Sequence, residues 1–351
     1  MQKAKFIYLK IKKLFIPICI CLFTVFLVVF SNTNLESAKH GLKIWANAVV
    51  PSLLPFFIST ELLGYTNIVS FLGKLLNKFM KPIFNVPGEG SFPLIMGIIS
   101  GYPVGAKIVS NLKNQGKISD IEAERLISFT NNSGPLFIIG TVGIGLFKNK
   151  QVGILLLITH ILAGLTVGFI FRWWKPKNKK TFVEKREKGA RPLFPSKEIS
   201  LANLGEILSN SILSAINTTL LIGGFIVIFC VIISILENSG LLKILSNILY
   251  PFLLIFKIPI TFANGIVSGI LELTNGVCKI AFIENSSLYT NIIVCAFLLG
   301  FGGISISFQI LSIISKANIS IKPYIIGKLL QGILAAVYTY LFIIYAPVFN
   351  I

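Results

Sequence analysis

Long apolar stretches are the feature of this sequence that restricts its fold most. Hydrophobic residues make up 54% of the chain and charged residues only 13%, whereas a soluble domain carries about 25% charged residues. Hydrocarbon offers backbone groups no hydrogen-bond partners, and about 20 helical residues cross a bilayer core of about 30 Å. We therefore expect an all-α polytopic membrane protein. Seven segments are predicted to cross, the first and third being short or tilted: 16–31, 44–65, 128–147, 152–173, 212–236, 288–312 and 323–346.

The formal net charge of +19 is concentrated in two parts of the chain. Lysines crowd residues 3–13, and basic residues return between Arg172 and Lys197. Both clusters flank apolar segments, as the positive-inside rule expects of cytoplasmic loops. No nucleic-acid-binding fold accompanies them, so we expect a lipid bilayer and no nucleic acid as partner. The basic leader precedes an apolar run that lacks an A-x-A-like cleavage site, which favours an uncleaved signal anchor.

No residue pattern indicates an enzyme. The sequence has no hydrolase, kinase or zinc signature, and its five cysteines lie in or beside apolar segments without metal-ligand spacing. We therefore predict no enzymatic activity, no cofactor and no metal site. His160, inside an apolar run, is interpreted as a packed, hydrogen-bonded residue.

Two further apolar segments, 91–110 and 259–282, are interrupted by Gly, Pro, Asn or Glu, and each is interpreted as a re-entrant hairpin or broken helix. They contain the related strings Gly97-Ile-Ile-Ser-Gly101 and Gly265-Ile-Val-Ser-Gly269. The order of elements around the two strings also matches, which indicates an internal repeat. The predicted organisation is a basic leader with a signal-anchor helix at 1–43, a first transport repeat at 44–173, a basic cytoplasmic linker at 174–207 and a second transport repeat at 208–351.

Counting crossings gives the two repeats opposite orientations. With the basic N-terminus inside, the first helix takes the chain outside, and three crossings return it to the basic linker. The second repeat then starts inside, and its three crossings leave the C-terminus outside. The amphipathic stretches 67–81 and 241–250 are expected to lie along the interface. Inverted repeats with broken helices that meet at mid-membrane are typical of secondary transporters.

The first interrupted segment combines a proline break with polar groups at membrane depth. Pro103 has no N–H and pushes Tyr102 away from helical geometry, while glycines permit positive φ or close backbone approach. A helix that restarts near Pro103 would direct free N–H groups at an anion, and Lys107 would add a positive charge. The alternative is a kinked helix whose lysine reaches the interface. The substrate-site candidates here are Ser100, Gly101, Tyr102, Pro103, Gly105 and Lys107.

A second polar group of residues lies in 129–145. Adjacent hydrogen-bonding side chains precede Gly134-Pro135, after which an apolar helix resumes, so we predict a helix start with polar caps. Placed against residues 100–107, it would complete a polar pocket; the alternative is an ordinary N-cap at the membrane surface. The candidates are Asn131, Asn132, Ser133 and Gly134.

The second half offers an ionisable residue between apolar neighbours, Glu272, which is costly in a membrane and therefore a functional candidate. It could bind a coupling proton or cation, pair with Lys107 across the repeat interface, or belong to a structural ion pair. Glu61 is a weaker candidate. Glycines in 299–309 are predicted to break a helix, as the counterpart of the asparagine segment. The further candidates in this half are Ser268, Gly269, Thr274, Asn275, Gly302, Gly303 and Ser305.

The string SGYPVGAK at 100–107, followed by FTNNSGPLFIIG at 129–140, resembles the sporulation integral membrane protein YlbJ family, also called stage V sporulation protein V. The resemblance extends from about Trp45 to Tyr345. That family belongs to the gate-domain group, which shares features with concentrative nucleoside transporters and with the membrane part of ferrous iron transporters. It implies a spore-forming bacterium and movement of dipicolinic acid across the outer forespore membrane during sporulation.

Three functions remain open at this point. The first is a transporter of a small organic anion, with dipicolinic acid as the substrate that the resemblance implies. The second is a nucleoside or other small-solute carrier on the same scaffold, and the third is a non-transporting membrane scaffold for spore assembly. Related scaffolds are also compatible with a homo-oligomer. The polar breaks at mid-membrane favour the two transport functions, because a scaffold has no use for them.

Overall fold

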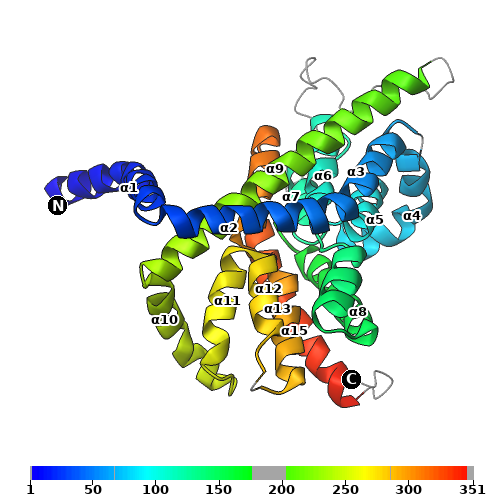
Figure 1. The fold of residues 1–351 in the computed structure, drawn as a ribbon. Coiled ribbons are helices and arrows are strands. Elements are labelled where there is room, and N and C mark those ends of the chain that lie inside the picture. Colours follow the sequence, from blue (N-terminus) through cyan, green and yellow to red (C-terminus); the bar gives the residue numbers. More distant parts are fainter. Residues whose placement is uncertain (1, 67, 176–202, 285, 346–351) are drawn as a thin grey trace.

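The computed structural model describes residues 2–66, 68–175, 203–284 and 286–345 (Figure 1). The described residues form helices and connecting turns, with no strand among them. Most of the predicted linker 174–207 lies outside the described residues. The predicted all-α polytopic fold is confirmed, and five of the described helical runs are long and apolar enough to cross a membrane: Ser31–Gly64, Lys150–Phe171, Leu204–Asn238, Leu288–Ala317 and Lys322–Tyr345.

Two predicted crossings are shorter than a membrane span. The first, 16–31, belongs to α1 (Gln2–Val29), whose apolar part is Leu14–Val29. The third, 128–147, begins as a non-helical stretch and is helical only in η3 (Leu136–Leu146), a π-helix. The side chains of Asn131 and Asn132 bond to other elements instead of capping this helix, and Gly134-Pro135 delays its start.

The described elements follow the same order in both halves. The first half consists of a long helical run (α2 Ser31–Ile44, η1 Trp45–Val49, α3 Val50–Gly64), α4 (Ile68–Phe84), the short η2 (Gly88–Gly90), a hairpin (α5 Ser91–Ile99, α6 Val104–Asn114), a broken segment (α7 Asp120–Ile127, η3) and α8 (Lys150–Phe171). The second half consists of α9 (Leu204–Asn238), α10 (Leu241–Ile255), a hairpin (α11 Thr261–Leu271, α12 Leu273–Ala281), a broken segment (α13 Leu288–Phe301, α14 Gly303–Ile314, then η4 Ser315–Ala317) and α15 (Lys322–Tyr345). The opposite orientation of the halves stays a prediction.

The two long helical runs, α2–η1–α3 of the first half and α9 of the second, cross in the middle of the molecule (Figure 1). At the crossing, a Cβ on Gly41 of α2 would lie 3.0 Å from the Cα atom of Val227 in α9. Trp45 lies over Gly223, and its indole Nε1 donates to the Thr219 carbonyl at 2.9 Å. The small glycines therefore allow two helix backbones to approach closely, as in many helix contacts within membranes.

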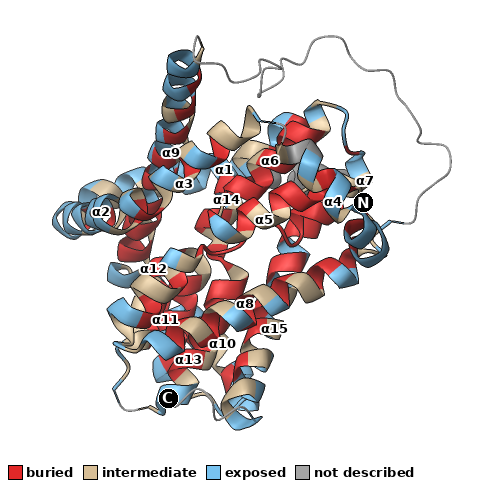
Figure 2. Cartoon of the chain, turned by 90° about the vertical axis from the view of Figure 1, so that its right-hand side faces the viewer, coloured by how far each residue is buried: buried red, intermediate tan, exposed pale blue. Residues whose placement is uncertain are grey.

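The amphipathic stretches form α4 and α10, each with large apolar side chains exposed on one face, such as Phe71 and Phe79 on α4 and Ile248 and Phe252 on α10. Such faces need lipid or protein against them, and the placement of these stretches along the interface stays a prediction. The buried residues gather along the hairpins and broken segments, whereas α2 is largely exposed (Figure 2). The two hairpins and the two broken segments thus lie in the interior, together with the buried faces of α8, α9 and α15.

Candidate functional site

The first hairpin closes around a backbone carbonyl of the broken segment beside it. A Cβ on Gly97 of α5 would lie 1.8 Å from the Thr130 carbonyl oxygen, and a Cβ on Gly105 of α6 would lie 2.1 Å from the same atom. No side chain fits at either position. The two glycines therefore let both arms of the hairpin contact the non-helical chain between α7 and η3.

The tip of this hairpin is the Gly-Tyr-Pro break that the sequence predicts. Gly101 has φ of +83°, and the Tyr102–Pro103 bond is cis. The backbone N–H of Tyr102 donates to the Asn132 carbonyl at 2.7 Å, and a Cβ on Gly101 would lie 2.9 Å from the Gly134 nitrogen. The tip thus lies against the polar break, as predicted for residues 100–107 and 131–134.

The asparagines join elements that are distant in sequence. Asn131 accepts the backbone N–H of Ala106 at 2.7 Å and so caps the start of α6, rather than the helix that follows Asn131. Asn132 accepts from the Gln331 side chain of α15 at 2.8 Å, and the Ser133 N–H donates to His160 Nε2 of α8 at 3.1 Å. The predicted caps are therefore tertiary contacts.

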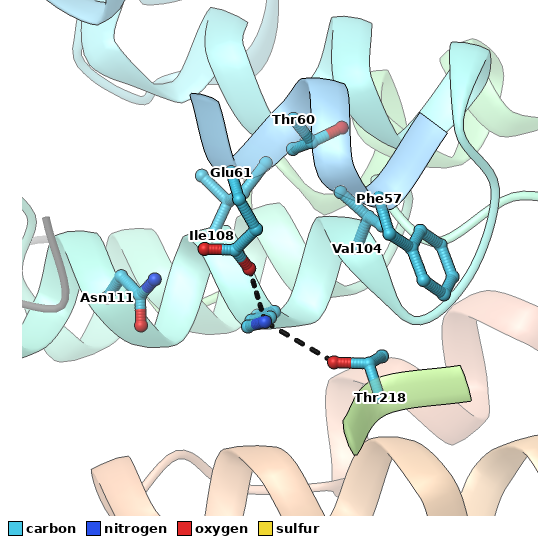
Figure 3. Close-up of a pocket in the computed structure, with 8 residues that line it drawn as sticks. Phe57, Thr60, Glu61, Val104, Ile108, Asn111 and Thr218 are labelled. Carbon is cyan, nitrogen blue, oxygen red and sulfur yellow. Dashed lines mark hydrogen bonds and ion pairs between the residues drawn. The ribbon is translucent and has the colours of Figure 1, made fainter. Parts of the chain in front are cut away.

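Lys107 lies away from the hairpin tips. Its ammonium group forms an ion pair with Glu61 of α3 and donates to Ser214 Oγ of α9 at 2.8 Å and to Thr218 Oγ1 at 3.3 Å. Figure 3 shows Glu61 and Thr218 on either side of this contact, in a small pocket that Asn111 also lines. Glu61, not Glu272, is therefore the partner of Lys107, and this charge links the first hairpin to both long helical runs.

The second hairpin is broken at Glu272, whose φ of −139° and ψ of 117° separate α11 from α12. The carboxylate caps α12, accepting the backbone N–H groups of Thr274 at 3.1 Å and Asn275 at 2.7 Å. Glu272 is only 3% exposed and forms no ion pair within the described part of the chain. A buried carboxylate that faces a helix N-terminus is favoured by the helix dipole.

The second broken segment contacts this tip in the same manner. Gly302 and Gly303 both have positive φ, of +83° and +86°, and separate α13 from α14 as predicted. A Cβ on Gly303 would lie 3.1 Å from the Gly269 carbonyl and 3.3 Å from the Leu273 nitrogen. Ser305, in the first turn of α14, is buried. The break at Gly302-Gly303 therefore lies against the break of the second hairpin, between Gly269 and Leu273.

Ser268 is an exception among the predicted site residues. Its hydroxyl accepts from Lys279 of α12 at 2.9 Å, and Lys279 also forms an ion pair with Glu237 of α9. In the first hairpin the corresponding Ser100 hydroxyl does not contact the lysine but lies 3.0 Å from Thr60 Oγ1, on the residue before Glu61. In each half, a lysine on the second arm of the hairpin thus binds a glutamate on a long helix.

One pocket collects side chains from both hairpin tips. Tyr102 and Gly101 line it from the first half, and Glu272 and Thr274 line it from the second. Gln309 of α14 also lines it, and the Oε1 atom of Gln309 is buried without a hydrogen-bond partner among the described residues. The remaining lining residues are Val49, Ser52, Leu53, Gly134, Phe137, Ile222, Ile226 and Ile306. An apolar cavity with a few convergent polar groups is typical of a small-molecule site.

The sequence reasoning missed a buried cluster on α15. Lys328 is 3% exposed and donates to the Asn131 carbonyl at 3.0 Å and to Gln331 Oε1 at 2.9 Å. Gln331 in turn contacts Asn132 and the His160 carbonyl. The sequence does contain a signal for this cluster, because a lysine within an apolar, membrane-length segment is a functional candidate.

Three comparisons agree with this architecture. The Gate family model, described as "Nucleoside recognition", matches residues 47–172 and 219–320. The sporulation integral membrane protein YlbJ of Bacillus subtilis (strain 168) is 40% identical over 339 residues, covering 95% of this chain and 83% of that protein. Among solved structures, CNTnw in an inward-facing substrate-bound state has a similar fold, with a TM-score of 0.53 at 15% identity and coverage of 92% of this chain and 86% of that one.

The family match includes both hairpins and both broken segments, and the Bacillus relative is similar along nearly the whole chain. The chain therefore belongs to the YlbJ family of sporulation integral membrane proteins, and it combines a Gate domain with a fold similar to that of CNTnw.

Proposed function

We propose that this protein carries a small organic anion, dipicolinic acid in the first instance, across the outer forespore membrane during sporulation. The observation that carries the proposal is the convergence of both hairpin tips on one pocket, where Tyr102 faces the same space as Glu272 and Thr274. Broken helices that meet between two repeats form the substrate sites of many secondary transporters. A membrane scaffold would gain nothing from such a pocket.

The pocket offers groups that suit a flat, aromatic dicarboxylate. Tyr102 supplies an aromatic ring and a hydroxyl group, and Thr274 supplies a second hydroxyl at the start of α12. An aromatic ring stacks favourably on another, and hydroxyl groups donate to carboxylates. Lys107 forms its ion pair with Glu61, so we do not assign it a contact with the substrate.

Glu272 shares this pocket, and its negative charge would repel a bound dianion. Among the described residues that line the pocket, Glu272 and Tyr102 are the titratable ones, and no cation lines it. We propose that Glu272 is protonated whenever the dianion is bound, so that a proton accompanies the substrate. Uptake should then rise as the pH falls, because protonated Glu272 becomes more abundant, and Glu272→Gln should lose most of this pH dependence.

The decisive experiment is uptake of labelled dipicolinate by liposomes that contain the purified protein, compared with empty liposomes at several pH values. We expect protein-dependent uptake that unlabelled dipicolinate inhibits. Tyr102→Ala should reduce it at least tenfold, whereas Tyr345→Ala, at the exposed end of α15, should leave it unchanged. Absence of uptake by well-folded protein, together with normal dipicolinate content in spores that carry Tyr102→Ala, would contradict the proposal and favour the scaffold.

A nucleoside is the second candidate substrate, because the matching family model is described as "Nucleoside recognition". The same liposomes separate the two candidates: labelled uridine that enters in place of dipicolinate would support the nucleoside, and dipicolinate uptake that excess uridine leaves unchanged would exclude it. A nucleoside has no carboxylates to repel Glu272, so its uptake should not need protonation of that residue.

A further inference from the structure

The buried lysine of α15 has surroundings that resemble a cation site. Lys328 is 3% exposed, and within the described residues it forms no ion pair. Its ammonium group donates to two neutral oxygens, the Asn131 carbonyl and Gln331 Oε1, at 3.0 and 2.9 Å. A charge inside a membrane protein is costly without compensation, and here carbonyl and amide dipoles provide that compensation.

The position of this ammonium group is as informative as its ligands. Asn131 lies in the non-helical stretch between α7 and η3, and a Cβ on Gly302, in the break of the second half, would lie 3.4 Å from Lys328 Cε. The lysine therefore contacts both broken segments. Unwound backbone carbonyls in broken helices are the groups with which secondary transporters hold coupling cations.

From this geometry we infer that Lys328 is a built-in monovalent cation: its ammonium group fills a site between the two helix breaks that would otherwise accept a free ion such as Na⁺ or NH₄⁺. Removing the side chain beyond Cβ would leave the Asn131 carbonyl and Gln331 Oε1 without their donor. The vacated space would then be bounded by oxygens that suit a monovalent cation.

The hydrogen bonds of His160 and Gln331, the polar side chains beside Lys328, are compatible with Lys328 as the single positive charge at this place. His160 Nε2 accepts the Ser133 N–H, which requires a neutral ring with its proton on Nδ1. Gln331 donates to the Asn132 side chain and to the His160 carbonyl, which leaves its own oxygen to accept from Lys328. Lys328 therefore fixes the orientation of the Gln331 amide, and the Ser133 N–H fixes the tautomer of His160.

The consequence for coupling rests on the proposed function. If Lys328 supplies the positive charge at the breaks, a transport cycle needs no free Na⁺ there. Uptake by the natural protein should be the same, within a factor of two, in Na⁺ and in N-methylglucamine.

The test of the site itself needs no substrate. We would measure thermal unfolding of the purified full-length protein in N-methylglucamine chloride and after addition of Na⁺, K⁺ or NH₄⁺. For the natural protein we expect no specific shift of the midpoint. For Lys328→Ala we expect a lower midpoint that one or more of these cations raises by several degrees. Lys328→Met fills the space with an apolar chain and should show no recovery, and Lys322→Ala, an exposed lysine on the same helix, should behave as the natural protein.

Two results would overturn the inference. One is that cations raise the midpoint of thermal unfolding of Lys328→Ala no more than they raise that of Lys322→Ala. The other is natural protein that Na⁺ specifically stabilises, which remains a valid measurement even if Lys328→Ala fails to fold. Loss of dipicolinate uptake with an intact cation response would instead count against the proposed function alone.

Discussion

The two hairpins occupy the same place in the order of elements but differ in how they close and in what they present at the tip. The first closes on a backbone carbonyl through Gly97 and Gly105 and presents a neutral tyrosine. The second has its arms packed on each other, with a Cβ on Gly276 placed 2.0 Å from the Gly269 Cα, and presents a carboxylate at Glu272. The difference suggests a division of roles: the first tip is fixed to its broken segment, and the second supplies the ionisable group.

The largest effect should come from Gly97, the first glycine of the first repeated string, and a much smaller one from its counterpart Gly265. Gly97→Ala places a methyl group 1.8 Å from the Thr130 carbonyl, a backbone atom that cannot move aside. We expect a loss of at least about 3 kcal/mol, at or beyond the upper end of overpacking costs. Gly265→Ala meets the end of the Ile280 side chain at 2.5 Å, which can rotate, and should cost about 1 kcal/mol.

Chemical unfolding followed by circular dichroism in detergent would measure both variants. Adding Ile280→Val to Gly265→Ala removes the atom in conflict and should recover stability. Equal losses for Gly97→Ala and Gly265→Ala would show that the two hairpins are held in the same way.

The next largest difference should lie between the two lysine–glutamate pairs, in the free energy of unfolding that is lost when the glutamate is neutralised. The Glu61 side chain is 10% exposed and that of Lys107 20%, whereas Glu237 and Lys279 are 46% and 32% exposed. Removing one partner of a buried pair costs about 3–5 kcal/mol, and an exposed pair contributes about 0–1 kcal/mol. We expect Glu61→Gln to cost about 2 kcal/mol and Glu237→Gln less than about 1 kcal/mol.

The same unfolding assay measures these variants. The double variant Glu61→Gln/Lys107→Met, which removes both charges, should recover most of the stability. If it is no more stable than Glu61→Gln alone, the unpaired ammonium group is not the cause of the loss.

The smallest effect should come from single hydroxyl groups at the tips. Tyr102→Phe and Thr274→Val each remove one hydrogen-bonding group from the pocket, and one such bond contributes about 1 kcal/mol. We therefore expect each variant to weaken dipicolinate binding three- to tenfold, measured as the concentration for half-maximal uptake in liposomes. An effect confined to one of the two would assign substrate contact to that half alone.

The sequence predicted the positions of the breaks better than their contacts. Gly101-Tyr102-Pro103 and Gly302-Gly303 end helices for local reasons, since proline lacks an N–H and glycine adopts positive φ. The partner of Lys107 depended on which helix crosses nearby, and residues as distant as Glu61 and Ser214 meet only through the tertiary fold. Lys328 lies in a segment whose apolar composition predicts an ordinary span, and its contacts with Asn131 and Gln331 depend on the tertiary fold.

Local patterns also misjudged segment 128–147. Its composition is that of a crossing helix, but Asn131 and Asn132 form hydrogen bonds with α6 and α15, and the chain stays non-helical up to Gly134. The competition between helix formation and tertiary hydrogen bonds is not visible in a single segment.

The close packing of Gly97 and Gly105 against the Thr130 carbonyl restricts which parts of the molecule can move relative to one another during a transport cycle. Backbone in direct contact on two sides cannot slide, so the first hairpin and its broken segment must travel together as one piece. Relative motion is then left to the surfaces between that piece and the long helices α3 and α9, where Lys107 forms its ion pair with Glu61 and its hydrogen bonds with Ser214 and Thr218. Spectroscopic labels that report movement belong across those surfaces, on α3 or α9 opposite α6.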